Sequence, residues 1–252
     1  MQIGIITIFP SMFYDFMNHG IIKNILKKNY LNLSFWNPRD YSENKRRKID
    51  HKIYGGGSGM LMQPKPLQNT ILTAKKELGS QIKTIYVSPK GDLLNQFKIV
   101  QLLKNKKLLI ICGRYKGIDE RIIFSEVDEE ISIGDYILSG GELAAMILID
   151  AISRMIPGVL KKKSYTTDSF FNGILSCPDY TYPKMFNNMK VPSVLLSGNH
   201  KKIAEWRLKH ALGQTWIKKP KLLDNINLTY KQKKLLHEFQ FEFYQKKEVF
   251  RK

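Results

Sequence analysis

Three glycine-bearing loops are the parts of this 252-residue sequence best suited to chemistry, because each is expected to follow a strand. They span residues 88–91, 113–121 and 132–142. Open α/β sheets bind ligands at the carboxyl ends of their strands, and glycine lets the backbone turn tightly and approach a bound molecule. Each loop by itself is more typical of an ordinary strand-to-helix turn than of a ligand site. Three of them along one sheet edge favour a ligand site, although they do not identify the ligand.

A fourth glycine-rich loop, residues 54–60, reads Tyr-Gly-Gly-Gly-Ser-Gly-Met. It lacks the Gly-Lys-Ser/Thr ending of a P-loop, and no G-x-G-x-x-G motif follows a strand and opens a helix. The sequence therefore argues against a nucleoside-triphosphate or dinucleotide site and favours a flexible loop near an active site. For the basic run at 45–48, phosphate contact and a solvated surface are equally good interpretations.

Metal catalysis and nucleophilic catalysis are not indicated. The histidines are scattered without metal-binding spacing, and two cysteines supply neither a disulfide framework nor a four-ligand zinc site. No Gly-x-Ser-x-Gly elbow follows a predicted strand. We therefore expect no protein-held metal; the residues concerned are His19, His51, His200, His210, His237, Cys112 and Cys177.

The elements that position the loops alternate between strand-like and helical patterns. Strands are predicted at 2–7, 31–36, 82–88 and 108–112, and helices at 65–78, 93–104 and 142–155. This alternation predicts an α/β fold with a mostly parallel sheet covered by helices on both faces.

The pattern changes after residue 156, where Ile-Pro-Gly ends the last of these helices. We expect a first domain at 1–160, a linker at 161–172 and a small all-helical domain at 173–252. Helices are predicted there at 199–212 and 229–244. Residues 201–252 contain 14 Lys+Arg and 5 Asp+Glu, a net charge of +9.

The whole chain has 41 Lys+Arg and 22 Asp+Glu, a formal net charge of +19, with 43% hydrophobic residues. So many apolar residues exclude a disordered basic tail, and the charge points to a polyanion such as nucleic acid. A general lysine bias (33 Lys against 8 Arg) explains part of the excess equally well. The apolar first ten residues predict a strand rather than a signal peptide, and no segment is apolar enough to span a membrane. We expect a cytosolic protein.

Taken together, five motifs resemble the bacterial tRNA (guanine-N-1)-methyltransferases, the TrmD family. They are residues 54–60, 112–121, 132–142, 167–170 (Thr-Asp-Ser-Phe) and 192–200, which ends in Ser-Gly-Asn-His, followed by Trp206 and Arg207. The resemblance runs in order from Ile3 to the last predicted helix. It implies a SPOUT-type first domain with a trefoil knot that binds S-adenosylmethionine. It also implies a homodimer with the active site at the subunit interface and a helical tRNA-binding domain.

By matching motifs, the resemblance also assigns residues. The cofactor would be bound by Tyr86, Pro89, Gly113, Ile133, Gly134, Asp135, Tyr136, Ile137, Leu138 and Gly140. The substrate would be guanosine 37 of tRNA, beside the anticodon and preceded by another guanosine. Asp168 would take the proton from ring nitrogen 1, and Arg154 would stabilise the charge that develops on the guanine oxygen. Asn199 and His200 would contact RNA.

Without the resemblance these residues have plainer interpretations. Asp168 is typical of a helix N-cap or turn, Arg154 of a surface charge near a helix C-terminus, and Asn199 of an N-cap. Two other functions also remain open at this point: an RNA-binding protein that has lost catalysis, and a SPOUT methyltransferase that acts on another RNA. Retention of Asp168 and Arg154 argues against the first, and the Ser-Gly-Asn-His and Thr-Asp-Ser motifs argue against the second.

The sequence departs from the family pattern at three positions. Lys116 stands where resembling enzymes carry a glutamate that the family links to efficient catalysis and to magnesium. Magnesium dependence is therefore left open. Ser58 and Ala144 each replace a usual proline, and we expect little effect from either change.

Overall fold

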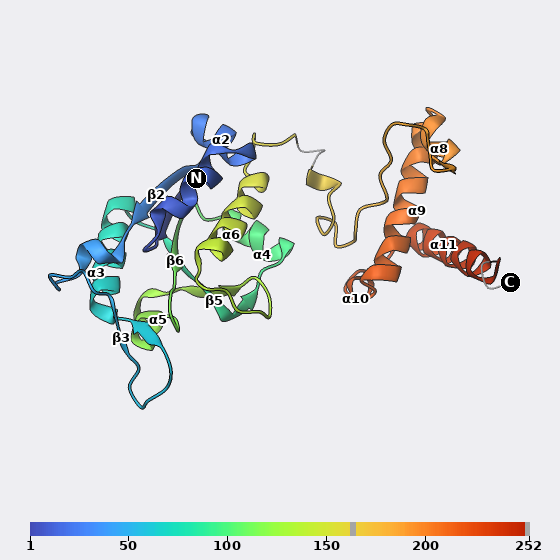
Figure 1. Ribbon diagram of the computed structural model, residues 1–252. Coiled ribbons are helices and arrows are strands. Elements are labelled where there is room, and N and C mark those ends of the chain that lie inside the picture. Colours follow the sequence, from blue (N-terminus) through green and yellow to red (C-terminus); the bar gives the residue numbers. More distant parts are fainter. Residues whose placement is uncertain (162–164, 250–252) are drawn as a thin grey trace. The chain divides into compact units, whose positions relative to one another are not determined.

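The computed structural model describes residues 1–161 and 165–249 and forms two compact units, Met1–Lys161 and Lys162–Lys252 (Figure 1). Residues 162–164 of the expected linker lie outside the described residues.

The first unit is built on a five-stranded sheet in the order β2-β1-β6-β5-β7. All neighbouring strands pair in parallel, which confirms the expected mostly parallel α/β fold. The central strands are buried on both faces, as their continuous apolar sequences require. Their bounds are β1 Gln2–Ile6, β2 Asn32–Trp36, β5 Lys83–Leu93, β6 Lys107–Cys112 and β7 Glu129–Ser132.

Helices cover both faces of this sheet. On one face α3 packs against β1, β6 and α5, and on the other α6 packs against β6, α4 and α2 (Figure 1). The helices are α1 Phe13–Asn18, α2 Gly20–Lys27, α3 Pro64–Leu78, α4 Gln96–Leu103, α5 Glu120–Glu126 and α6 Glu142–Met155, with short 3-10 turns η1 Pro10–Met12 and η2 Pro38–Tyr41. A small hairpin, β3 Asp50–Lys52 with β4 Met60–Met62, carries the glycine-rich loop of residues 54–60 at its tip.

One predicted helix starts at a different place. The sequence pattern predicts a helix at 93–104, whereas β5 continues to Leu93 and α4 begins only at Gln96. The Asn95 side chain accepts a hydrogen bond from the Lys98 amide at 2.9 Å and so caps the helix at that point.

The end of β5 is irregular, and its pairing with β7 shifts register between Val87 and Asp92. Gly91 lies directly on the β7 backbone, where a Cβ atom would overlap Glu130 and Ile131. The β7 residue Glu129 pairs with Lys83 at 2.8 Å and with Lys98. These contacts hold β7 against β5 and α4, beside the irregular part of β5 at residues 88–91.

We predict that Glu129→Gln lowers the free energy of unfolding by about 2 kcal/mol at pH 7, between the values typical of exposed and fully buried pairs. Burial alone would raise the pKa of the Glu129 carboxyl, but the hydrogen bonds and charges of Lys83 and Lys98 outweigh burial and lower it below 4.5. A carboxyl whose pKa is lower in the folded than in the unfolded protein stabilises the fold at pH values above its unfolded-state pKa. This stabilisation is lost as the pH falls through the folded-state pKa. Urea unfolding should therefore show a smaller difference at pH 3 than at pH 7. An equal difference at both would contradict this role.

The second unit contains α8 Ser193–Leu196, α9 His200–Lys218, α10 Lys221–Asp224 and α11 Tyr230–Val249. Helices α9 and α11 pack together where Gly213 lies against the Phe239 ring and leaves no room for a Cβ atom. The expectation of an all-helical unit is wrong in one respect. Residues Met185–Phe186 (β8) and Met189–Lys190 (β9) form an antiparallel hairpin. Asn187 and Asn188 connect them with φ of 48° and 60°, as a tight hairpin turn requires.

Candidate active site

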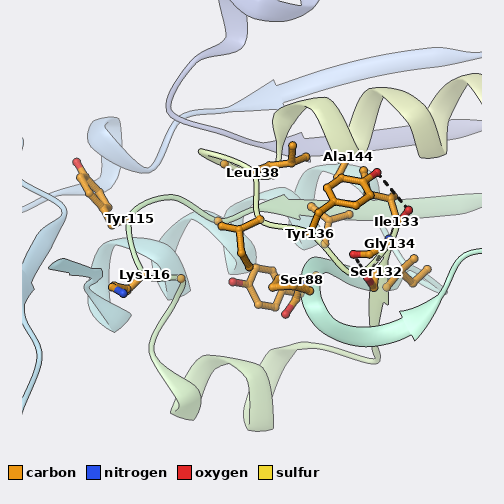
Figure 2. A pocket seen from close by; sticks show the side chains of 18 residues that line it. Ser88, Tyr115, Lys116, Ser132, Ile133, Gly134, Tyr136, Leu138 and Ala144 are labelled. Atoms are coloured by element: carbon orange, nitrogen blue, oxygen red, sulfur yellow. Dashed lines mark hydrogen bonds between the residues drawn. The ribbon is translucent and has the colours of Figure 1, made fainter. Parts of the chain in front are cut away.

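Residues 86–89 of β5 and the loops that follow β6 and β7 meet in one pocket of about 280 Å³ in the first unit (Figure 2). The expectation that residues 88–91 form a loop after a strand is wrong, because they are an irregular part of β5, which continues to Leu93. Of the ten predicted cofactor residues only Asp135 does not line it. The lining residues are Tyr86, Val87, Ser88, Pro89, Gly113, Tyr115, Lys116, Gly117, Ile131, Ser132, Ile133, Gly134, Tyr136, Ile137, Leu138, Gly140, Gly141 and Ala144.

Gly141 and Gly113 bring the β7–α6 loop onto the β6–α5 loop. The Gly141 amide donates to the Gly113 carbonyl at 2.9 Å. A Cβ atom on Gly141 would lie 2.7 Å from Val87 Cγ2 and 2.8 Å from Cys112 Cα, so the start of α6 can lie this close to β5 and β6 only without a side chain. The sequence motif suggested Gly140 but missed Gly141, whose role depends on contact with strands distant in the sequence.

Tyr86 lies at the base of the pocket, against Gly113 and Gly117. Its burial, together with the charge of Glu130, raises the pKa of the phenol to about 12. The hydroxyl therefore stays protonated throughout the physiological range and adds no charge to the pocket.

The turn after β7 is held by its own polar groups. The Gly134 amide donates to Ser132 Oγ at 3.2 Å, and Tyr136 Oη donates to the Ile133 carbonyl at 3.3 Å (Figure 2). Gly134 has φ of 150°, and its Cβ would overlap the Tyr136 ring. The resulting wall of the pocket consists of apolar and aromatic side chains and turned backbone.

Lys116 is the one charged residue among those that line the pocket. Its amide donates to the Met60 carbonyl at 2.9 Å, and its side-chain stem lies where a Cβ on Gly59 would be. The loop of residues 54–60 is therefore next to the pocket, as expected of a loop near an active site; its flexibility stays a prediction.

The sequence model of the family described as tRNA (Guanine-1)-methyltransferase TrmD matches residues 1–225. The chain belongs to this family. A relative from Buchnera aphidicola subsp. Schizaphis graminum, named tRNA (guanine-N(1)-)-methyltransferase, is 57% identical over 93% of this chain and 89% of its own length. Proteins of the same name from Baumannia cicadellinicola subsp. Homalodisca coagulata and Enterobacter sp. (strain 638) are each 52% identical, over 96% of this chain and 97% and 95% of their own lengths.

The two residues predicted to be catalytic in this TrmD-family chain lie in different units. Arg154 is exposed in the last turn of α6, in the first unit. Asp168 belongs to the second unit and lines a pocket of about 270 Å³ there with Asp179 and Arg207, among other residues. Its amide donates to the Tyr165 carbonyl at 3.2 Å, which agrees with the plainer interpretation of Asp168 as a turn residue.

The predicted RNA contacts begin α9 of the second unit. Asn199 caps the helix, its Oδ1 accepting from the Lys202 amide at 3.1 Å, and His200 is the first helical residue. The N-cap interpretation of Asn199 is therefore confirmed, and its contact with RNA stays a prediction.

Among residues 1–161 and 165–249, no three His, Cys, Asp or Glu side chains gather as a metal site would require. Within that same part of the chain, no helix combines the length and apolar character needed to cross a membrane.

Proposed function

We propose that this TrmD-family chain transfers a methyl group from S-adenosylmethionine to ring nitrogen 1 of guanosine 37 in tRNA. The observation that carries the proposal is the meeting of β5 and the two loops after β6 and β7 on one pocket, in a chain whose relatives are named tRNA (guanine-N(1)-)-methyltransferase. Activity on tRNA implies a cytoplasmic enzyme.

The pocket residues fit S-adenosylmethionine. The volume of the pocket, about 280 Å³, is near the lower end of the range for small-molecule sites. Its walls combine apolar side chains with a few polar groups, as is typical of such sites. Gly113, Gly140 and Gly141 line the pocket, and the space that a Cβ atom would need at each is filled by Tyr86, Arg114 and Val87 respectively. These glycines therefore let the segments around the pocket pack closely enough to form a wall for an adenine ring. Bound there, the cofactor supplies an electrophilic methyl group on a sulfonium.

We also propose that the first unit contains the trefoil knot of SPOUT enzymes. After β7 at one edge of the sheet, the chain returns past the end of β5 to reach Gly113 at the end of β6, and α6 starts there. The loop of residues 133–141 thus ends against Val87 of β5 and Gly113 after β6, which is what a segment threaded past these two parts of the chain would do.

A homodimer with the active site at its subunit interface is part of the proposal. Ile137, which lines the pocket, is 81% exposed, and Leu143 and Ile147, one turn apart in α6, are each 48% exposed. Exposed apolar side chains that gather beside a site are typical of an interface.

The chain's own side chains would then carry the reaction. Ring nitrogen 1 of guanine bears a proton and becomes nucleophilic only after losing it, and the Asp168 carboxylate is the base we assign. Loss of the proton places negative charge on the guanine oxygen, which the Arg154 guanidinium would stabilise. The second unit would bind tRNA through phosphate contacts of its basic residues, with Asn199 and His200 at the start of α9.

Lys116 gives a prediction specific to this chain. A lysine cation lining the pocket repels the sulfonium of S-adenosylmethionine but has no such effect on neutral-sulfur S-adenosylhomocysteine. Lys116→Gln should therefore raise the affinity for S-adenosylmethionine relative to S-adenosylhomocysteine. The expected change is only roughly 2- to 5-fold, because solvent screens an exposed charge. Calorimetric titration of both ligands measures this ratio, with Lys76→Gln on α3 as the control. An unchanged ratio would refute the effect. Lysine also offers no oxygen ligand, so we propose that any magnesium requirement does not act through this residue.

The proposed function is tested with methyl-labelled S-adenosylmethionine and unmodified bacterial tRNA, followed by digestion to nucleosides and mass spectrometry. We expect label in 1-methylguanosine. Label in a ribose methyl group would indicate another activity of the superfamily, and tRNA binding without label would indicate an RNA-binding protein that has lost catalysis.

A further inference from the structure

A carboxylate is completely buried beside the pocket. Glu142, the first residue of α6, is 0% exposed. Its Oε1 accepts a hydrogen bond from Thr7 Oγ1 at 2.9 Å, and its Oε2 lies 2.9 Å from Arg114 Nε. Neither Arg114 Nε nor Glu142 Oε2 makes a hydrogen bond, so this second contact is an ion pair only. A buried charge is retained only where partners compensate it, and both partners come from other segments of the chain.

Arg114 extends this contact to the neighbouring loops. Its Nη1 donates to the Ser139 carbonyl at 3.2 Å, and its guanidinium lies over the Phe9 ring at 4.6 Å from the centroid. The backbone of Arg114 also forms an isolated antiparallel β-bridge with Gly140. A Cβ atom on Gly140 would overlap both the Arg114 and the Glu142 side chains. Three segments, residues 7–9, 113–114 and 139–142, therefore meet at a single ion pair.

Neither member of the pair lines the pocket, but their neighbours Gly113, Gly140 and Gly141 do. We propose that the Glu142–Arg114 pair, supported by Thr7, is a clamp that positions the loop of residues 133–141 for cofactor binding. This inference rests on the proposed function, since the ligand is S-adenosylmethionine. Both are positioning residues, because they act through the loop.

The clamp should act through the population of the binding-competent loop. Glu142→Gln keeps the side-chain shape and an oxygen to accept from Thr7, but it removes the charge that attracts Arg114. If the competent loop conformation falls to about a tenth of the population, the apparent Kd rises about 10-fold.

The test compares Glu142→Gln, Arg114→Met and the double variant by calorimetric titration with S-adenosylmethionine. We expect each single variant to raise the Kd at least ~10-fold. The double variant should be no worse than Glu142→Gln, because it leaves no uncompensated charge and the two losses share one interaction. Additive losses in the double variant would overturn the clamp, as would wild-type affinity in Glu142→Gln.

Lys75→Met is the matched control. Lys75 and Glu126 form another partly buried ion pair at 2.9 Å in the first unit, between α3 and α5, and neither lines the pocket. Loss of the Lys75–Glu126 pair should leave the Kd for S-adenosylmethionine within twofold of wild type. The Kd of every variant for tRNA should also stay within twofold of wild type. A parallel rise in either control would mean general destabilisation and overturn the clamp.

Two further outcomes are separable. If Glu142→Gln does not fold, Thr7→Val keeps both charges and removes only the hydroxyl contact; it should raise the Kd about 3-fold, and no rise would overturn the clamp. If the wild-type protein itself does not bind S-adenosylmethionine, the proposed function fails, and the clamp fails with it.

Discussion

Replacing Asp168 by asparagine is expected to reduce methyl transfer about 10³-fold or more while leaving S-adenosylmethionine binding within twofold of wild type. Asparagine has nearly the same shape, but its amide cannot take the proton from guanine, and general-base catalysis typically contributes 10²- to 10⁴-fold. Asp168 does not line the pocket of the first unit, so the cofactor affinity has no reason to change. Single-turnover methyl transfer and calorimetric titration measure the two quantities separately.

Asp179→Asn is the matched control, since Asp179 lines the same pocket of the second unit and has no assigned role. We expect it to retain methyl transfer within about threefold. Equal losses in both variants would mean that Asp168 acts through the structure of the second unit. Loss of cofactor binding in Asp168→Asn would exclude its role as a base.

Gly141→Ala is expected to weaken S-adenosylmethionine binding by about 5- to 150-fold. The added Cβ would lie 2.8 Å from Cys112 Cα, a backbone atom of a central strand that cannot move aside. The start of α6 must shift instead, and with it the contact of Gly141 with Gly113 that closes the pocket. Overpacking of this kind typically costs about 1–3 kcal/mol. If all of this cost falls on binding, the Kd rises about 5- to 150-fold.

Gly20→Ala is the matched control for this variant. Gly20 has φ of 60° and nothing within 4 Å of an added Cβ, so the change should cost local backbone strain without touching the pocket. We expect it to lower the thermal midpoint slightly and leave the Kd unchanged. If Gly141→Ala binds the cofactor as tightly as Gly20→Ala does, the packing described here does not shape the site.

The parallel sheet could be predicted because its strands are short apolar runs separated by helical patterns. A strand before the loop of residues 132–142 was expected, but its bounds were not predicted, since Glu129 and Glu130 make half of β7 acidic. The pairing of Glu129 with Lys83 and Lys98 is a property of the fold. The β8–β9 hairpin carried a usable signal in Asn187 and Asn188, two residues that readily adopt positive φ.

The pocket loops were predictable from their glycines and their place after strands, but the direction of each side chain was not. Asp135 was expected in the pocket, yet it does not line it, because the turn at Gly134 brings Tyr136 back onto Ile133 instead. The pairing of Arg114 with Glu142 joins residues 28 positions apart and leaves no pattern in the sequence.

The proposed activity is tested most directly with two tRNA transcripts that differ only at position 37, one with guanosine and one with adenosine, each incubated with the protein and methyl-labelled S-adenosylmethionine. We predict label in the guanosine transcript, recovered as 1-methylguanosine at position 37, and none in the adenosine transcript. Equal labelling of both transcripts, or no labelling of either, would contradict it.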